Sequence, residues 1–179
     1  IGSNDGTFLR PFQEKGCHIL GIDPAENLAN AVTNAGVSTT EKFFNKELAE
    51  DLLEQQGPAD IIIARNVIPH VKDIHSVIDG ISILLNSNSI GIIEFHDSKL
   101  ILDELQYDYI YHEHLFYYSL ESIGKLLCRH GLEIFDVSRS PISGGSWVVF
   151  FSKSLKRKKS LALRNTEKDE ELSGVNSLE

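Results

Sequence analysis

The chain has 179 residues, of which 41% are hydrophobic and 24% charged, values that are ordinary for a globular domain. Its formal net charge of −9 disfavours nucleic acid or an anionic membrane as the main partner, and no apolar run is long enough for a membrane span. The two cysteines, Cys17 and Cys128, lie far apart and outside any CxxC, which excludes a disulfide framework and a zinc site and favours a cytoplasmic protein.

Predicted strands and helices alternate along the first 131 residues. The chain opens on "IGSNDG", which resembles the end of a strand followed by a glycine-rich turn, so we expect a fragment of a longer protein. The predicted strands cover residues 18–23, 37–44, 59–67 and 89–97. The predicted helices cover residues 7–15, 24–36, 45–57, 73–85 and 119–131, and residues 98–106 admit a further short one. The run "ADIIIARNV" is continuously apolar, as in a strand buried on both faces.

Residues 132–153 break this alternation. They hold two strand-like segments joined by a turn rich in proline and glycine, with no helix between them, which predicts an antiparallel hairpin. The chain is therefore predicted to be an α/β protein with a mostly parallel sheet, to which the hairpin adds one antiparallel strand. We expect one domain over residues 1–152. The polar residues 153–179 are predicted to form a frayed helix or a disordered tail, as in a linker to a further C-terminal domain.

The glycine-rich turn and a following acid suggest a ligand site. Ligands of parallel α/β sheets bind at the carboxyl ends of the strands, where the turn over residues 2–6 is expected. Gly2 and Gly6 allow a ligand to approach the backbone closely, and Asp23 ends the second strand, where a carboxylate binds ribose hydroxyls. The alternative is a plain strand–helix turn with Asp23 as a helix cap.

The spacing of the glycines narrows the set of candidate ligands. A dinucleotide fingerprint reads GxGxxG, whereas here Asn4 replaces the middle glycine of a GxGxG pattern. This spacing does not suit pyrophosphate and favours the methyltransferase variant, in which the turn faces the methionine part of S-adenosylmethionine. A C-terminal antiparallel strand is also typical of methyltransferase sheets.

The stretch "YDYIYHEHLFYYS" over residues 107–119 concentrates tyrosines and two histidines beside a carboxylate. A metal site over residues 112–114 is disfavoured because adjacent side chains diverge. A structural role, with tyrosines in the core and hydrogen-bonded histidines, is a second reading. The third is an acid–base centre, because histidine takes up a proton near neutral pH and a neighbouring carboxylate or phenol orients it. Methyl transfer to carbon needs such a base.

Several motifs together resemble one family, the NDP-sugar C-methyltransferases, over about residues 1–152. The motifs are "IGSNDGT", "GIDPAENLA", "ARNVIPHV", "IYHEHLFYYSL", "RHGLEIFDV" and "PISGGS". The resemblance implies a class I, Rossmann-like fold that depends on S-adenosylmethionine, and transfer of a methyl group to the carbon next to the ketone of an NDP-4-keto-deoxysugar. It implies that a histidine removes the sugar proton and that the resulting enolate attacks the methyl group.

The resemblance also assigns roles to individual residues. His114 matches the base, while Tyr111, Glu113 and His70 match residues on the substrate side. The implied cofactor contacts are Gly2, Ser3, Asn4, Asp5, Gly6, Asp23, Pro24, Phe43 and Asn66. Core packing explains the pair Phe43 and Phe44 equally well.

The chain also departs from the family pattern. Members carry an N-terminal module that binds zinc and a further C-terminal domain, neither of which lies in these residues, so zinc is expected only in that module. Trp147 after the "GGS" and the stretch "EFHDSK" differ from the family, which leaves the sugar open. Two other functions remain: a nucleotide-dependent oxidoreductase of related topology, and a cofactor-binding module without turnover.

Overall fold

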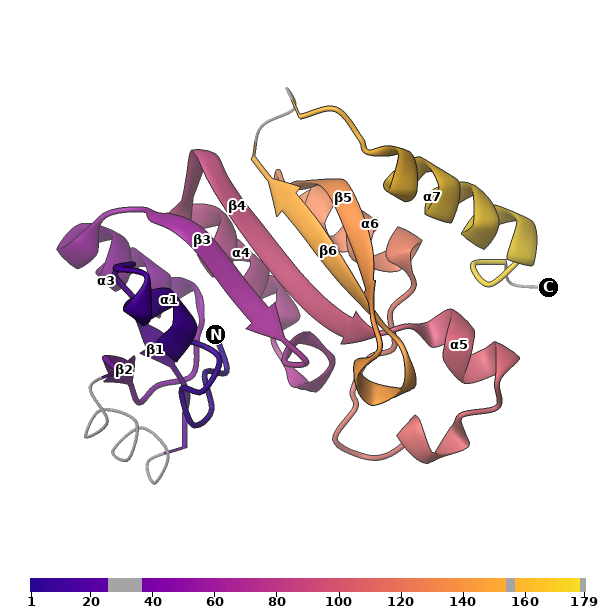
Figure 1. Cartoon of the computed structure of the whole chain (residues 1–179), viewed down its shortest axis with the longest axis horizontal. Coiled ribbons are helices and arrows are strands. Elements are labelled where there is room, and N and C mark those ends of the chain that lie inside the picture. The colour runs from indigo at the N-terminus through magenta and orange to yellow at the C-terminus, as the bar shows by residue number, and fades with distance from the viewer. Residues whose placement is uncertain (26–36, 154–156, 178–179) are drawn as a thin grey trace. The chain divides into compact units, whose positions relative to one another are not determined.

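The structure, a computed structural model, describes residues 1–25, 37–153 and 157–177. The chain divides into two compact units, Ile1–Asn45 and Lys46–Glu179. Both units combine helices with strands, which confirms the predicted α/β class (Figure 1).

The first unit contains one short helix and a two-stranded parallel sheet. Helix α1 spans Arg10–Glu14, with proline in its first turn, and strands β1 (Gly21–Ile22) and β2 (Thr39–Thr40) pair in parallel. All three are shorter than the predicted 7–15, 18–23 and 37–44. After the end of β1, Asp23 N donates to Thr40 O of β2 at 3.1 Å, and the Asp23 side chain accepts from Asn4 N in the glycine-rich turn. Most of the predicted helix 24–36 lies outside the described residues.

The second unit is built on a four-stranded sheet. Its strands are β3 (Ala59–Arg65), β4 (Leu85–His96), β5 (Glu133–Ser140) and β6 (Ser146–Ser152), arranged in the order β3-β4-β6-β5. Strands β3 and β4 are parallel, and β6 lies antiparallel between β4 and β5. This order confirms the predicted hairpin and its single antiparallel strand.

Helices surround this sheet. They are α3 (Lys46–Gln56), α4 (Ile74–Leu84), α5 (Ser98–Asp103), α6 (Leu120–Arg129) and α7 (Leu161–Ser173), with short 3-10 turns η1 (Ile68–His70), η2 (Tyr107–Tyr109) and η3 (Ile142–Gly144). Helix α4 packs against α3 and β4, whereas α6 and α7 pack against β5 (Figure 1). Polar N-cap residues fix the start of two helices. The Asp73 side chain accepts from Ser76 N at the start of α4, and Ser119 forms a capping box with Ser122 at the start of α6.

One face of the sheet carries the core. Ile93, Phe95, Val149 and Phe151 are fully buried there on β4 and β6. Each such side chain stabilises the fold by about 1.5–3 kcal/mol. Phe151 lies across Gly91, where an added Cβ would stand 2.2 Å from its ring, so only glycine fits at that position.

Strand β3 is not buried on both faces, contrary to the prediction. Ile62 and Ala64 are buried, but Ile61 is 51% exposed. Strand β3 is the edge strand of the four-stranded sheet, so its neighbours cover it less completely than the continuous apolar run suggested.

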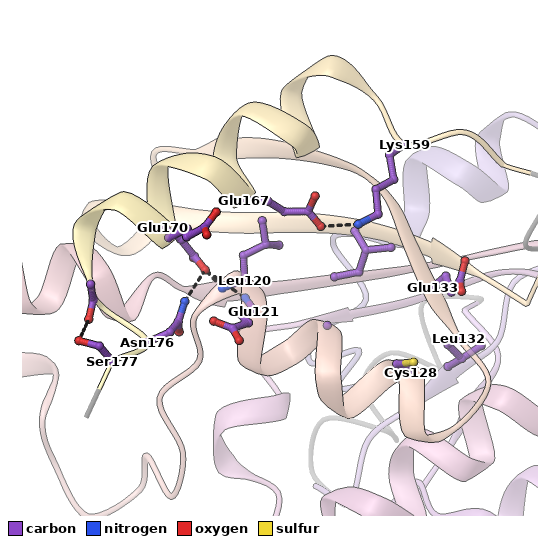
Figure 2. A pocket seen from close by; sticks show the side chains of 14 residues that line it. Leu120, Glu121, Cys128, Leu132, Glu133, Lys159, Glu167, Glu170, Asn176 and Ser177 are labelled. Atoms are coloured by element: carbon purple, nitrogen blue, oxygen red, sulfur yellow. Dashed lines mark hydrogen bonds and ion pairs between the residues drawn. The ribbon is translucent and has the colours of Figure 1, made fainter. Parts of the chain in front are cut away.

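Among the polar C-terminal residues, Leu161–Ser173 form helix α7, which docks on the second unit. Leu163 of α7 is fully buried, and Glu170 is 3% exposed. The Glu170 carboxylate accepts hydrogen bonds from Leu120 N at 2.7 Å and Glu121 N at 3.0 Å, at the start of α6 (Figure 2). A carboxylate at a helix N-terminus satisfies free N–H groups and complements the helix dipole. Among the helices of the described residues, none combines the length and apolarity that a membrane crossing needs.

Candidate active site

The glycine-rich turn of the first unit adopts the left-handed backbone that its sequence requires. Gly2, Asn4 and Gly6 have φ angles of 65°, 49° and 71°. Gly2 N and Ser3 N both donate to the carbonyl of Ile22, at 2.8 and 3.3 Å, which fixes the turn to the end of β1. Glycine and asparagine are the residues that adopt this conformation at least cost.

The side chain of Asp23 is hydrogen-bonded to the backbone of this turn. Its Oδ2 accepts from Asn4 N at 2.8 Å and its Oδ1 from Ala25 N at 3.0 Å, and the residue is 8% exposed. A carboxylate offers about four acceptor positions, so two backbone bonds leave it capacity for hydroxyl donors. The arrangement contains the predicted turn–acid pair, whereas the alternative role as a cap of the helix 24–36 concerns residues that lie mostly outside the described part of the chain.

The remaining predicted cofactor residues of the first unit differ in exposure. Asp5 is exposed and accepts from Thr7 N at 3.0 Å, a bond that lowers the pKa of its carboxyl. Ser3 is half-buried, and its Oγ has no hydrogen-bond partner among the described residues. Phe43 is 78% exposed whereas Phe44 is 7% exposed, so of this pair only Phe44 packs in the core.

Asn66 belongs to the second unit and follows strand β3. Its φ of 52° places it in the left-handed region, and its N–H donates to Glu94 O at 2.8 Å. Beside it, Arg65 Nε donates to the buried Glu94 Oε2 at 2.5 Å across the β3–β4 pair. Asn66 therefore sits at a sharp turn at the carboxyl end of β3, as predicted for strand-end residues of this sheet.

Three predicted residues of the second unit meet in one cluster. The ring centroids of His70 and His114 are 4.7 Å apart, and those of Tyr111 and His114 are 4.4 Å apart. Tyr111 Oη lies 3.2 Å from His114 Nε2. His70 comes from η1, whereas the other two come from the loop between η2 and α6. The backbone joins these segments, since Leu115 N donates to Pro69 O at 2.8 Å.

The hydrogen bonds of His114 determine which of its ring nitrogens carries the proton. His114 Nδ1 lies 3.0 Å from the carbonyl oxygen of Tyr109, which only accepts, so Nδ1 is the donor. In the neutral ring Nε2 is then the unprotonated nitrogen, facing the Tyr111 hydroxyl. Burial, and more weakly the neighbouring His70 and His96, lower the pKa of His114, against the raising effect of its bond to Tyr109. An unprotonated Nε2 with a lowered pKa is the state that a general base requires.

His70 repeats this pattern. Its Nδ1 lies 2.9 Å from the carbonyl oxygen of Glu113, so its Nδ1 also donates and its Nε2 is free of the proton in the neutral ring. Glu113 contributes this backbone carbonyl, while its side chain is exposed. The negative charge of Glu113 acts on His114 only as the weakest of the influences on its pKa, raising it.

The tyrosines of this segment are mostly outside the core. Tyr107 is 79% exposed, Tyr111 41% and Tyr117 40%, and Tyr118 alone of the segment's five tyrosines is buried. The reading of the cluster as core-filling tyrosines is therefore wrong for these three side chains. Among the described residues, no group of three or more His, Cys, Asp or Glu side chains is arranged to hold a metal ion.

Sequence reasoning missed three residues that support the cluster. Tyr109 provides the carbonyl for His114, and its ring stacks on His96 with centroids 4.1 Å apart. Gln106 bonds to His96 at 2.7 Å. The departure of "EFHDSK" from the family pattern was the one available signal, since it contains His96. A cavity of about 670 Å³ between α6, β5 and α7 contains none of the predicted site residues (Figure 2).

Comparison with known proteins shows the family to which this chain belongs. A family model described as "Methyltransferase domain" matches residues 1–137. The C-methyltransferase NovU of Streptomyces niveus is 38% identical over 150 residues, which are 84% of this chain and 36% of that protein. This similarity bears out the C-methyltransferase resemblance of the motifs. A ubiquinone biosynthesis O-methyltransferase of Rhodopseudomonas palustris (strain TIE-1) is 29% identical over 52% of this chain and 37% of its own length. The chain thus spans little more than a third of the length of these curated relatives.

Solved structures agree on the fold. Magnesium protoporphyrin IX methyltransferase (ChlM) from Synechocystis PCC 6803, solved with bound SAH, has a TM-score of 0.66 at 16% identity, over 86% of this chain and 72% of that one. A SAM-dependent methyltransferase from Thermotoga maritima, a possible histamine N-methyltransferase, has a TM-score of 0.61 at 16% identity, over 86% and 80% of the two chains. The chain belongs to the methyltransferase domain family and has the fold of class I SAM-dependent methyltransferases.

Proposed function

We propose that this chain is the catalytic domain of a SAM-dependent C-methyltransferase that acts on an NDP-4-keto-deoxysugar, with His114 as the general base. The observation that carries the proposal is the bond from His114 Nδ1 to the Tyr109 carbonyl, which leaves Nε2 without a proton. Transfer to carbon needs a base of this kind, whereas transfer to an oxygen or nitrogen nucleophile often needs only positioning. Similarity to a C-methyltransferase over 84% of the chain supports the same reaction class.

The glycine-rich turn suits S-adenosylmethionine. The buried Asp23 keeps acceptor capacity for the two ribose hydroxyls, and the left-handed residues Gly2 and Gly6 open the backbone to close approach. When bound, S-adenosylmethionine supplies the electrophilic methyl group. For Asn66, which follows β3 in the second unit, the cofactor contact stays a prediction from the motif resemblance alone. The exposed Phe43 is free to stack on an adenine, whereas Phe44 is committed to the core.

The tautomers of His114 and His70 determine which ring nitrogens can accept a proton or a hydrogen bond from the substrate. His114 Nε2 takes the proton from the sugar carbon beside the ketone, and the electrons of that C–H bond move into the enolate. The enolate carbon would then bond to the methyl group of bound S-adenosylmethionine as the methyl–sulfur bond breaks, with S-adenosylhomocysteine as the leaving group. Tyr111 Oη, which lies beside Nε2, and His70 are the groups that we assign to the enolate oxygen and the sugar hydroxyls.

The lowered pKa of His114 sets the pH dependence of this step. Proton removal needs the unprotonated ring, so the rate rises as the pH increases through the pKa and levels off above it. Because burial lowers this pKa, we expect the rise to lie below the ordinary range of histidine, and full activity at neutral pH.

The substitution His114→Ala in the intact protein tests the proposal. We expect methyl transfer to an NDP-4-keto-6-deoxyhexose to fall by roughly 10²–10⁴-fold. Exchange of the sugar α-proton with deuterium in D₂O should fall in parallel, while calorimetric affinity for S-adenosylhomocysteine stays unchanged. The matched control is His18→Ala, which removes an exposed histidine of the first unit.

Three results would contradict the proposal. Full turnover and proton exchange in the His114→Ala variant would exclude this residue as the base. Absence of turnover in the unmodified protein, with intact S-adenosylhomocysteine binding, would favour the cofactor-binding module. Saturable binding of NAD in place of S-adenosylhomocysteine would favour the oxidoreductase.

A further inference from the structure

His96 is a buried histidine that neither the motifs nor the proposed chemistry uses. It is the last residue of β4 and is 7% exposed. Its ring lies almost parallel to that of Tyr109, with an interplanar angle of 12° and centroids 4.1 Å apart. A stack this close fixes the position of both rings.

Two further side chains fix the orientation of His96. Gln106 Nε2 donates to Glu104 Oε2 at 2.6 Å, and because a carboxylate only accepts, the amide oxygen of Gln106 must face the other way. That oxygen lies 2.7 Å from His96 Nε2, which is therefore the protonated nitrogen of the ring. His96 Nδ1 is buried and has no hydrogen-bond partner among the described residues.

The stack continues to the candidate base through the main chain. The carbonyl oxygen of Tyr109 accepts from His114 Nδ1 at 3.0 Å and from Tyr117 Oη at 3.4 Å. The position of this carbonyl depends on the ring of the same residue, and that ring rests on His96. A displacement of His96 therefore moves the acceptor that keeps the proton on His114 Nδ1.

We propose that His96 is a positioning residue that acts through Tyr109 to hold His114 in the tautomer whose Nε2 is unprotonated. This proposal rests on the proposed function, in which His114 is the base. His96 touches neither the base nor the reacting atoms in this role. It belongs to the "EFHDSK" stretch, which differs from the apolar-aromatic run expected of the family.

Other ionisable groups around His114 have to be separated from His96 in any pH experiment. His70 from η1, and Tyr111, Glu113 and Tyr117 from the loop, all face or influence His114. None of them changes in a substitution at position 96. Both His96→Ala and His96→Phe remove the direct effect of His96 on the pKa of His114. A shift of the pH profile that is larger in His96→Ala than in His96→Phe therefore reports the loss of the support from β4.

A pair of variants at position 96 tests the proposal. His96→Ala removes the ring that stacks on Tyr109, whereas His96→Phe keeps a flat ring and loses the bond to Gln106 and the electrostatic effect of His96 on His114. Two-bond ¹H–¹⁵N spectra of the chain labelled in its histidines report the tautomer of His114 without any substrate. We expect a single Nδ1–H tautomer in the unmodified chain and in His96→Phe, and a mixture of tautomers in His96→Ala.

Kinetics of the intact protein provide the second readout. We expect kcat of His96→Ala to fall by roughly 10- to 100-fold with little change in KM, because misplacement of a base affects the chemical step. Its pH profile should move to higher pH. His96→Phe should restore most of kcat, and of the pH shift only the part that does not come from the lost electrostatic effect of His96 on His114. Tyr107→Ala is the matched control, because it removes a 79% exposed ring from the same turn.

An unchanged His114 tautomer in His96→Ala would overturn the proposal. So would failure of His96→Phe to restore it, since the stack would then not be the cause. The signals of the remote pair His75 and His130, joined at 2.9 Å, show whether each variant is folded. Failure of the proposed function is a separate result, because it appears as full activity in His114→Ala whatever the spectra show.

Discussion

Asp23 in the first unit and Glu170 in the second make the same bonds in different settings. Each is a buried carboxylate that accepts from two backbone N–H groups, Asn4 and Ala25 in one case, Leu120 and Glu121 in the other. Asp23 lies among backbone in the left-handed region and keeps free acceptor capacity. Glu170 caps a helix and accepts a third bond, so its bonds serve the fold. Burial and backbone bonding of an acid therefore do not identify a ligand site. We propose that the backbone around the acid and its remaining acceptor capacity distinguish Asp23 from Glu170.

The largest effect on this comparison is expected from Glu170→Ala. Removal of the carboxylate leaves the N–H groups of Leu120 and Glu121 without their acceptor, which should lower the free energy of unfolding by about 2–4 kcal/mol. Urea denaturation measures the loss. The neighbouring exposed residue provides the control, Glu171→Ala, which should change stability by less than about 0.5 kcal/mol. Equal losses in both variants would show that the cap is unimportant.

A smaller loss of stability, joined to a loss of binding, is expected from Asp23→Asn. The amide retains one acceptor oxygen, and its NH₂ group faces either Asn4 N or Ala25 N, so one bond is lost at a cost of about 1–3 kcal/mol. Calorimetry should show that the affinity for S-adenosylhomocysteine is at least roughly tenfold weaker than in the unmodified protein, which corresponds to a loss of about 1.4 kcal/mol in binding free energy. The control is Glu14→Gln, which converts an exposed carboxylate of the first unit to an amide outside the predicted cofactor contacts. If Asp23→Asn destabilises the chain but binds normally, Asp23 has the same purely structural role as Glu170.

The smallest effect is expected from Asn176→Ala. Its amide donates to Glu170 Oε2 at 3.4 Å and accepts from Ser119 Oγ at 2.6 Å, both near the solvent. We expect a loss of about 0.5–1.5 kcal/mol in the free energy of unfolding. A loss as large as that of Glu170→Ala would mean that the amide, and not the carboxylate, organises this helix start.

The sequence predicted the parts of the fold that depend on local patterns. The apolar runs in residues 59–67 and 89–97 predicted strands β3 and β4, and the proline–glycine turn predicted the hairpin of β5 and β6. It did not predict that α7 docks, because the residues that hold it act at long range. Leu163 is one apolar residue in a charged stretch, and the partners of Glu170 lie 49 and 50 residues away in the chain.

The candidate site divides in the same way. The turn over residues 2–6 was predictable because glycine spacing reflects backbone angles, and His114 was found through its motif. The partners of His114 were not predictable, because they are carbonyl groups that every residue possesses. Glu113 was expected to orient the base or to bond the sugar and its enolate oxygen, which stays a prediction, and the structure shows in addition that its backbone carbonyl bonds to His70. Only the fold reveals which carbonyl faces which imidazole.

The bond from His114 to the Tyr109 carbonyl has a consequence for mutational tolerance. No side-chain substitution deletes a main-chain oxygen, so a scan of position 109 should not reveal a polar requirement there. It should show a preference for flat rings that rest on His96, with phenylalanine accepted as readily as tyrosine. A position that orients the proton of the base would then look, in a collection of variants, like an ordinary packing position.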